Sequence, residues 1–345
     1  MPGLQKHPQA EVVALCGRNE ANCRAMADRL GIPDIHTDYH DLVNRADIDA
    51  VTVATPDALH EAVAMAALKA GKHVFCEKPL TKTVEQAREV TSVARQSGLV
   101  HMVAFTFRYN RSLERLKEML KQWAIGQPTY ISCEVHWPSA MNPNGTSAWR
   151  NYAEDSAAGI LGDMGIHFFD TIQYILSPVT SLSALLAVLP RTARDQKTGE
   201  QRTTDAIDLT SCLLRTAYEA PTVPPVVQGH MITSWMTPPR GHNGNLHVVG
   251  TEGAFNATLG RGQREQLERF KPGKGWEPVA LPEDATTDQT TALGRMMGSF
   301  VDAILRGAVD ASHDATFLDG LRTQLAMDAA IRSAQSGRWE DVPAE

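Results

Sequence analysis

The chain has 345 residues, 43% of them hydrophobic and 21% charged, a composition typical of a soluble globular protein long enough for two domains. Its formal net charge is −7 and its Lys and Arg residues are scattered, which argues against a nucleic-acid partner. The five cysteines form no C-x-x-C pair and no apolar run reaches about 18 residues, so we expect no disulfide framework, no zinc site and no membrane span, and we expect a cytoplasmic location.

Residues 1–125 alternate short apolar runs with helical patterns. Strands are predicted at 11–17, 49–55, 73–79 and 100–107, and helices at 20–31, 58–71 and 83–98. Strands that are apolar throughout and separated by helices indicate parallel crossovers. The pattern predicts a doubly wound, Rossmann-like α/β sheet in a first domain.

Residues 126–345 have a different pattern, with few helices between the predicted strands. Strands are expected at 128–137, 179–190, 205–216, 226–236, 245–251 and 253–260, a long hairpin loop at 191–204, and helices at 290–306 and 314–336. This predicts an α+β second domain with a large, mostly antiparallel sheet, whose last helix packs back on the first domain. The open face of that sheet must be covered, which favours a homodimer or homotetramer.

Ligands of parallel α/β sheets bind where the strands end, so the residues after each strand are informative. Gly17 and Arg18 follow the first predicted strand. At the end of the second strand of a dinucleotide-binding domain, an acidic residue binds the 2′-hydroxyl of NAD, whereas an Arg accommodates the 2′-phosphate of NADP. Gly17 and Arg18 are expected to occupy that site, without an acidic residue. NADP is therefore favoured over NAD as the cofactor. The alternative is that Arg18 is an ordinary surface residue in a turn.

The next two strands are also followed by polar residues. Thr55, Pro56, Asp57 and His60 follow the second strand; Pro56 and Asp57 suit the end of a strand and the start of a helix, and His60 could be a plain helix-surface residue. Glu77 and Lys78 follow the third strand. A Lys in such a crevice can stabilise an alkoxide or polarise a carbonyl, whereas the alternative is a surface salt bridge. Arg108, beyond the fourth strand, is expected to hold substrate or cofactor.

The stretch "GILGDMGIHFFD" (159–170) sets an acid and a base four residues apart in an apolar, glycine-punctuated segment. Asp163 and His167 would share one face of a helix. Two ligands are too few for a zinc site. The segment could also be an ordinary core helix with a capping Asp and one satisfied His.

Three motifs together resemble the Gfo/Idh/MocA family of NAD(P)-dependent oxidoreductases: "ATPDALH" (54–60), "CEKPLT" (76–81) and "AGILGDMGIHFFD" (158–170). Further segments similar to the family lie at 104–110, 148–152, 248–255 and 319–339. The resemblance implies a sugar, cyclitol or similar polyhydroxy substrate.

The resemblance also implies roles for particular residues. It makes Lys78, Asp163 and His167 catalytic, with His167 as the general base, an assignment that agrees with the chemistry of imidazole. Trp149 and Arg150 would join the catalytic residues and Arg108 in holding the substrate; the alternative for Trp149 is packing between the domains. The implied cofactor-binding residues are Gly17, Arg18, Thr55, Pro56, Asp57, His60, Glu77, Lys78 and Arg108.

The family's first strand and its G-x-G-x-x-G turn have no counterpart before residue 11, so the first domain is expected to lack them. That turn supplies backbone N–H groups to the pyrophosphate. Two alternatives to a dehydrogenase therefore stay open: a catalytically silent module for binding or oligomerisation, and an NAD-dependent glycosidase of the same family. An upstream targeting signal also stays open.

Overall fold

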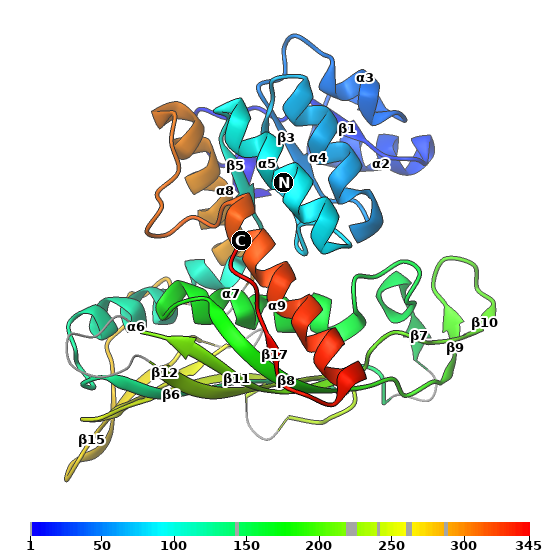
Figure 1. Cartoon of the computed structure of the whole chain (residues 1–345). Coiled ribbons are helices and arrows are strands. Elements are labelled where there is room, and N and C mark those ends of the chain that lie inside the picture. Colours follow the sequence, from blue (N-terminus) through cyan, green and yellow to red (C-terminus); the bar gives the residue numbers. More distant parts are fainter. Residues whose placement is uncertain (1, 142–144, 219–225, 240–241, 260–263, 286–288) are drawn as a thin grey trace.

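The computed structural model describes residues 2–141, 145–218, 226–239, 242–259, 264–285 and 289–345. Parallel strands form the N-terminal part, in two separate sheets (Figure 1). β1 (Ala14–Cys16) pairs with β2 (Asp34–His36), and β3 (Ala50–Val53), β4 (His73–Cys76) and β5 (His101–Val103) pair in that order. The predicted Rossmann-like parallel arrangement is confirmed.

Helices connect the parallel strands: α2 (Glu20–Leu30), α3 (Tyr39–Val43), α4 (His60–Lys69) and α5 (Val84–Ser97). Helices α2, α4 and α5 lie where the sequence predicts them, whereas α3 was not predicted. A short helix, α1 (Pro2–Gln5), precedes β1. Helix α5 begins at a capping box, in which Thr83 and Gln86 bond each other's backbone, and it ends at Gly98 in the left-handed region (φ 69°). Its predicted limits are therefore confirmed by local hydrogen bonding.

A nine-stranded sheet forms the rest of the molecule, in the order β16-β15-β14-β13-β6-β12-β11-β8-β17. Its strands are β6 (Pro128–His136), β8 (Val179–Ala187), β11 (Leu209–Ala217), β12 (Val226–Ser234), β13 (Gly244–Gly250), β14 (Ala254–Thr258), β15 (Leu267–Lys271), β16 (Gly275–Pro278) and β17 (Glu340–Asp341). All pairs are antiparallel except β12 with β6, so the predicted large, mostly antiparallel sheet is confirmed, with one parallel pair at its centre.

The segment 191–204, expected as a loop, contains two short strands. β9 (Thr192–Asp195) and β10 (Gln201–Thr203) form a hairpin, and β7 (Thr146–Ser147) pairs with β9. Asp195 Oδ1 accepts the backbone N–H groups of Lys197 and Thr198 at 2.8 and 2.9 Å, which closes the turn. This Asx-type turn makes a polar segment a hairpin, so the loop prediction was wrong in detail.

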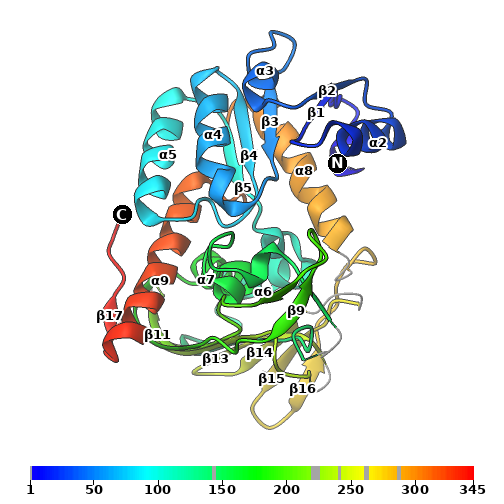
Figure 2. The same ribbon diagram turned by 90° about the vertical axis from the view of Figure 1, so that its right-hand side faces the viewer.

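Three helices cover one face of the large sheet (Figures 1 and 2): α6 (Arg111–Lys121), α7 (Ile166–Ile175) and α9 (Phe317–Ser336). Helix α9 also contacts α5 and β5, as expected for the last helix. Helix α8 (Gln289–Arg306) packs on the β3–β5 sheet, where Phe300 meets Phe75 with ring centroids 5.5 Å apart. The sequence did not predict this second return to the first domain.

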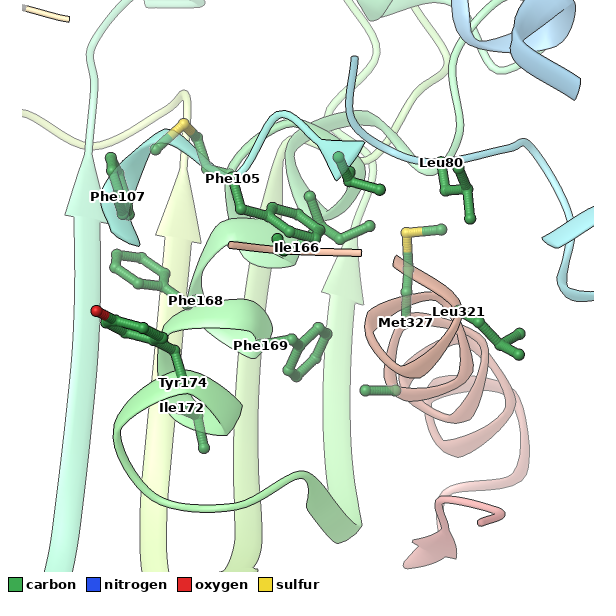
Figure 3. Close-up of a cluster of buried hydrophobic side chains, with 14 of the residues drawn as sticks. Leu80, Phe105, Phe107, Ile166, Phe168, Phe169, Ile172, Tyr174, Leu321 and Met327 are labelled. Carbon is green, nitrogen blue, oxygen red and sulfur yellow. The ribbon is translucent and has the colours of Figure 1, made fainter. Parts of the chain in front are cut away.

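A shared hydrophobic core joins the two parts of the molecule (Figure 3). It contains Leu80 and Phe105 from the parallel part, Ile166, Phe168 and Phe169 from α7, and Leu321 and Met327 from α9. Each fully buried side chain of this size stabilises the fold by about 1.5–3 kcal/mol. The junction that carries the candidate site is therefore a packed one. No helix in the described ranges is long and apolar enough to cross a bilayer.

Candidate active site

An ion pair between Lys78 and Asp163 bridges the parallel part and the large-sheet part of the molecule. Lys78 Nζ lies 2.7 Å from Asp163 Oδ1 and 2.5 Å from the backbone oxygen of Asp163. The two side chains are only 10% and 17% exposed. Lys78 is the second residue after the end of the strand β4, so it lies just beyond a strand, as predicted. The surface-salt-bridge alternative is wrong, because the pair is largely buried.

Asp163 lies in a π-helical turn (Leu161–Gly165) that runs directly into α7. Wide turns of this kind frequently mark functional sites. Glycine is required here by the approach of backbone: a Cβ on Gly162 would lie 1.6 Å from the carbonyl oxygen of Ala157. The segment is thus not the regular helix expected from the four-residue spacing.

His167 lies in the first turn of α7 with only 5% of its surface exposed. Its ring stacks on Phe107 with centroids 4.8 Å apart and an interplanar angle of 29°. It also meets the edge of the Phe105 ring at 6.0 Å. Both phenylalanines belong to the "AFTFRYN" segment noted in the sequence, but their contact with the imidazole was not predicted. The imidazole therefore has an aromatic, poorly hydrated surrounding.

The charge on Asp163 is stabilised by its neighbours. Burial acts to raise the pKa of Asp163, but the positive charges of Lys78 and Arg150 and the hydrogen bond from Lys78 outweigh burial, and the pKa is lowered. Arg150 Nε lies 3.2 Å from Asp163 Oδ1, and the guanidinium lies 4.2 Å from the Trp149 ring centroid. Trp149 and Arg150, both predicted to bind substrate, thus lie beside the ion pair.

A small polar depression, largely filled by the side chains around it, lies beside the ion pair. It is lined by Asp57, Lys78, Pro79, Arg150, Ser156, Gly159, Gly162 and Asp163. Asp57 Oδ2 accepts the backbone N–H of Ala157 at 3.0 Å, across the junction of the two parts. Burial raises the pKa of Asp57, opposed by that hydrogen bond and by nearby positive charges. Sequence reasoning treated Asp57 as a helix cap and missed this cross-junction contact.

His60 is not on a helix surface: it is 1% exposed. Its Nδ1 lies 2.7 Å from the carbonyl oxygen of Pro79, and its Nε2 lies 2.9 Å from that of Thr55. Both ring nitrogens therefore face backbone of the two loops that follow β3 and β4. The ring braces these loops and presents no nitrogen to a ligand, contrary to the expectation that it contacts the cofactor.

Arg108 is also placed differently from the prediction. It is 4% exposed, and its guanidinium donates to Asp170 and to the carbonyl oxygens of His313 and Asp314, with Asp319 3.1 Å away. All of its nitrogens are used inside the protein. The assignment of Arg108 to substrate or cofactor is corrected, because no donor is directed toward the pocket.

The residues at the ends of β1 and β3 fit part of a dinucleotide. Arg18 is exposed between β1 and α2 and makes no ion pair or side-chain hydrogen bond with any described residue. Gly17 packs tightly, since a Cβ there would lie 2.7 Å from Cys23 Sγ. Thr55 Oγ1 is buried without a hydrogen-bond partner in the described ranges. An anion at Arg18 and a polar group at Thr55 would satisfy these side chains.

The other parts of a cofactor site are less complete. Pro56 ends the segment after β3 and precedes a 3₁₀ turn, η1 (Asp57–Leu59). Glu77 accepts the backbone N–H of Lys78 at 3.3 Å. The sequence holds no G-x-G-x-x-G turn. Nowhere in the described ranges do three or more His, Cys, Asp or Glu side chains lie together as metal ligands would.

A parallel nucleotide-type sheet beside a mixed sheet, with Lys, Asp and His at their junction, defines a two-part oxidoreductase. The chain belongs to the Gfo/Idh/MocA oxidoreductase family. Residues 1–105 match the model of the "Oxidoreductase family, NAD-binding Rossmann fold", and residues 113–256 match that of the "GFO/IDH/MocA C-terminal domain".

Two named relatives match the chain, one over most of its length and one over about half of it. A levoglucosan dehydrogenase of Pseudarthrobacter phenanthrenivorans is 27% identical over 94% of this chain and 88% of its own length. An inositol 2-dehydrogenase of Klebsiella pneumoniae is 32% identical over 49% of this chain and 47% of its own length. The solved structure of a levoglucosan dehydrogenase with NADH and L-sorbose has a TM-score of 0.86, 24% identity, and covers 99% of this chain and 92% of that one. At that identity the structural likeness establishes the fold.

Proposed function

We propose that the protein transfers a hydride between a nicotinamide cofactor and a hydroxyl-bearing or carbonyl carbon of a sugar, cyclitol or similar polyhydroxy compound. The observation that carries this proposal is the buried Lys78–Asp163 pair, in which Asp163 belongs to the π-helical turn that leads to His167. A bound nicotinamide supplies or accepts the hydride. The protein's own groups must then manage the proton and the charge on oxygen.

Each of the three residues has a distinct role in this proposal. The His167 imidazole takes the hydroxyl proton during oxidation and returns it during reduction. The Lys78 ammonium stabilises the negative charge that develops on the substrate oxygen. Asp163 stays ionised because its pKa is lowered. Its carboxylate can accept a hydrogen bond from a second hydroxyl group of the substrate and can stabilise the protonated form of the His167 ring. Burial of the pair strengthens these interactions, since the local dielectric constant is low.

The polar lining of this site supports a polar substrate. The lining carries two cationic and two acidic side chains, Lys78, Arg150, Asp57 and Asp163. Alternating charges of this kind suit a compound with several hydroxyl groups. Trp149 offers an aromatic face beside Arg150. Relatives named for levoglucosan and inositol support the same substrate class.

Arg18 supports NADP as the preferred cofactor. Its exposed guanidinium has no partner among the described residues, and no acidic residue stands beside it directly after β1. A guanidinium binds a phosphate group through charge-assisted hydrogen bonds. The 2′-phosphate of NADP would provide that partner, whereas the 2′-hydroxyl of NAD would leave the charge unpaired.

The free face of the large sheet supports assembly of the protein into a homodimer or a homotetramer. Leu185, Leu213 and Val226 are 74%, 58% and 54% exposed, and the strand register places them on one face. Figure 1 shows α6, α7 and α9 on the opposite face. Exposed apolar side chains gathered on one face favour association.

The experiment that tests the function is a turnover assay. The protein is incubated with NADP⁺ or NAD⁺ and, one at a time, levoglucosan, myo-inositol, glucose and an aliphatic alcohol, and the absorbance of reduced nicotinamide is followed. We expect reduction with at least one polyhydroxy compound, none with the alcohol, and no turnover for His167→Gln. His40→Gln, at an exposed position on α3, is the matched control. Turnover of His167→Gln at the rate of the control would overturn the role of His167.

A further inference from the structure

The Arg108 guanidinium forms a buried, multiply bonded contact with Asp170. Its Nε lies 3.1 and 2.9 Å from the two carboxylate oxygens of Asp170, and its Nη2 lies 2.6 Å from Oδ1. The two side chains are 4% and 1% exposed. Because a guanidinium and a carboxylate meet in a planar fork, this contact fixes orientation as well as distance.

The contact joins the elements that carry the His167 ring and its aromatic neighbour. Arg108 and Phe107 are consecutive residues of the 3₁₀ turn η2 (Thr106–Tyr109), while Asp170 and His167 are three residues apart on α7. Phe107 stacks on His167 at 4.8 Å. The ion pair and the ring stack are therefore neighbouring contacts between the same two elements, and a shift in one moves the other.

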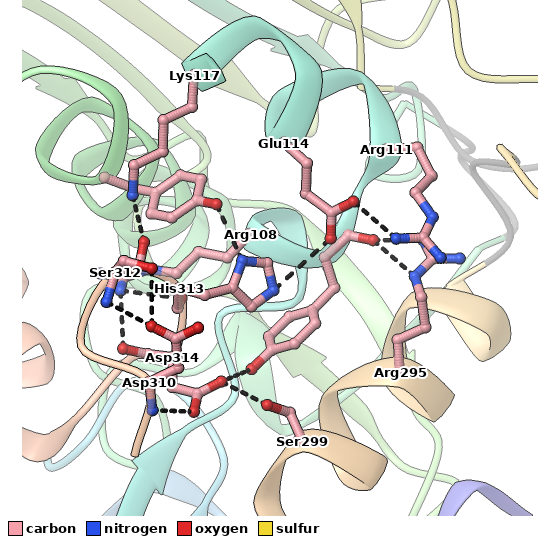
Figure 4. Close-up of polar contacts among 12 residues, drawn as sticks. Arg108, Arg111, Glu114, Lys117, Arg295, Ser299, Asp310, Ser312, His313 and Asp314 are labelled. Carbon is pink, nitrogen blue, oxygen red and sulfur yellow. Dashed lines mark hydrogen bonds and ion pairs between the residues drawn. The ribbon is translucent and has the colours of Figure 1, made fainter. Parts of the chain in front are cut away.

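Arg108 is also held by two residues from the C-terminal part of the chain. Its Nη2 lies 3.1 Å from Asp319 Oδ1, at the start of α9, and its Nη1 lies 3.1 Å from the carbonyl oxygen of Asp314. Asp314 is held in turn by Tyr109 and Ser299, each at 2.6 Å (Figure 4). Arg108 thus has little freedom to move.

Stability alone is a weak reason for such a contact. A buried ion pair can often be replaced by apolar side chains without loss of stability, because removing the charges from water costs about as much as their attraction returns. The observed arrangement instead gives a defined geometry to three elements that meet beside His167.

We propose that Arg108 is a positioning residue for His167: by holding Asp170 it sets the position of α7 against η2, which keeps the imidazole stacked on Phe107 and directed for proton transfer. This inference rests on the proposed function only for its catalytic consequence. The positional consequence, a change in the stacking of the His167 ring, can be observed without any substrate.

The test combines a spectrum with kinetics. Histidine labelled with ¹³C in the ring gives one resonance per histidine, and the resonance of His167 is assigned by its loss in His167→Gln. A proton above an aromatic face resonates upfield, so the Phe107 ring should shift the resonance of the His167 ring proton upfield. We expect Arg108→Gln to remove most of that displacement and Arg108→Lys to restore part of it. Arg111→Gln is the matched control, because Arg111 forms exposed ion pairs with Asp284 and lies outside this contact.

In the turnover assay, Arg108→Gln is expected to lower kcat by about 100-fold with little change in KM, the size of effect produced by a misplaced catalytic group. An unchanged His167 resonance in a folded Arg108→Gln protein overturns the proposal. A displaced resonance with unchanged kcat supports the positioning and contradicts the catalytic role of His167 instead. If Arg108→Gln does not fold, Asp170→Asn, which keeps the shape of the side chain, is judged by the same two readouts.

Discussion

Replacing Lys78 by Met tests the ion pair at the junction. The change removes the ammonium that lies 2.7 Å from Asp163 Oδ1 and leaves an apolar chain of similar length. Asp163 then keeps one cationic neighbour, Arg150 at 3.2 Å. We therefore expect the variant to be destabilised, but not to the full extent of an unpaired buried charge.

The expected magnitude follows from the geometry. Removing one partner of a buried pair costs about 3–5 kcal/mol. Arg150 remains and Asp163 is 17% exposed, so we expect a loss below that range, about 2–3 kcal/mol. A chain of 345 residues has an unfolding entropy of about 0.7 kcal/mol per kelvin, which converts this loss to a fall of about 3–4 °C in melting temperature.

The assay is differential scanning calorimetry at neutral pH, with Lys82→Met as the control. Lys82 also joins the two parts, through an exposed hydrogen bond to the carbonyl oxygen of Glu154. Loss of that bond should cost less than about 1 kcal/mol. If Lys78→Met melts at the same temperature as Lys82→Met, the pair does not hold the junction and the reasoning fails.

The same pair predicts a dependence on pH. The pKa of Asp163 is lowered in the folded protein, so its ionised form contributes stability above the unfolded pKa of about 3.9. That contribution is lost as the pH falls through the lower, folded pKa. The wild-type protein should lose more stability than Lys78→Met across this acid range. Parallel curves for the two proteins would contradict the assignment.

Three further changes test other parts of the site. His167→Gln should abolish turnover while the melting temperature still rises with NADP; loss of both would mean that the ring supports the fold instead. Arg18→Glu should lower kcat/KM for NADP about 10–100-fold relative to NAD, the value of one or two charge-assisted hydrogen bonds, and an unchanged ratio would exclude Arg18 as the selector. Gly162→Ala places a Cβ 1.6 Å from the carbonyl oxygen of Ala157, so melting should fall by more than about 4 °C; a normal melting curve would show that the turn relaxes freely.

Local signals in the sequence predicted the parallel half well. Thr83 and Gly98 delimit α5 through a capping box with Gln86 and a left-handed backbone angle, which depend only on residues close in the chain. The strands β3 and β4 are predicted because they are apolar runs bounded by helices. Such features need no knowledge of distant contacts.

Contacts between distant residues explain what the sequence did not predict. Arg108 was expected at the crevice because it follows a strand, but its partners lie 62 and 211 residues further along the chain, at Asp170 and Asp319. His60 was ambiguous because the carbonyl oxygen it faces belongs to Pro79, in another loop. The family resemblance placed Lys78 and Asp163 in one catalytic set, but their ion pair was not predicted, since no local pattern links residues 85 positions apart.

The most direct test of the account is a titration of the melting temperature with NADP and with NAD. A ligand at 100 times its dissociation constant adds about 2.7 kcal/mol of stability. For a chain of 345 residues this is a rise of about 4 °C. We expect the melting temperature to rise with both nucleotides, and the rise to begin at lower concentrations of NADP. No rise with either nucleotide at millimolar concentration would contradict the claim that this protein is a nicotinamide-dependent oxidoreductase.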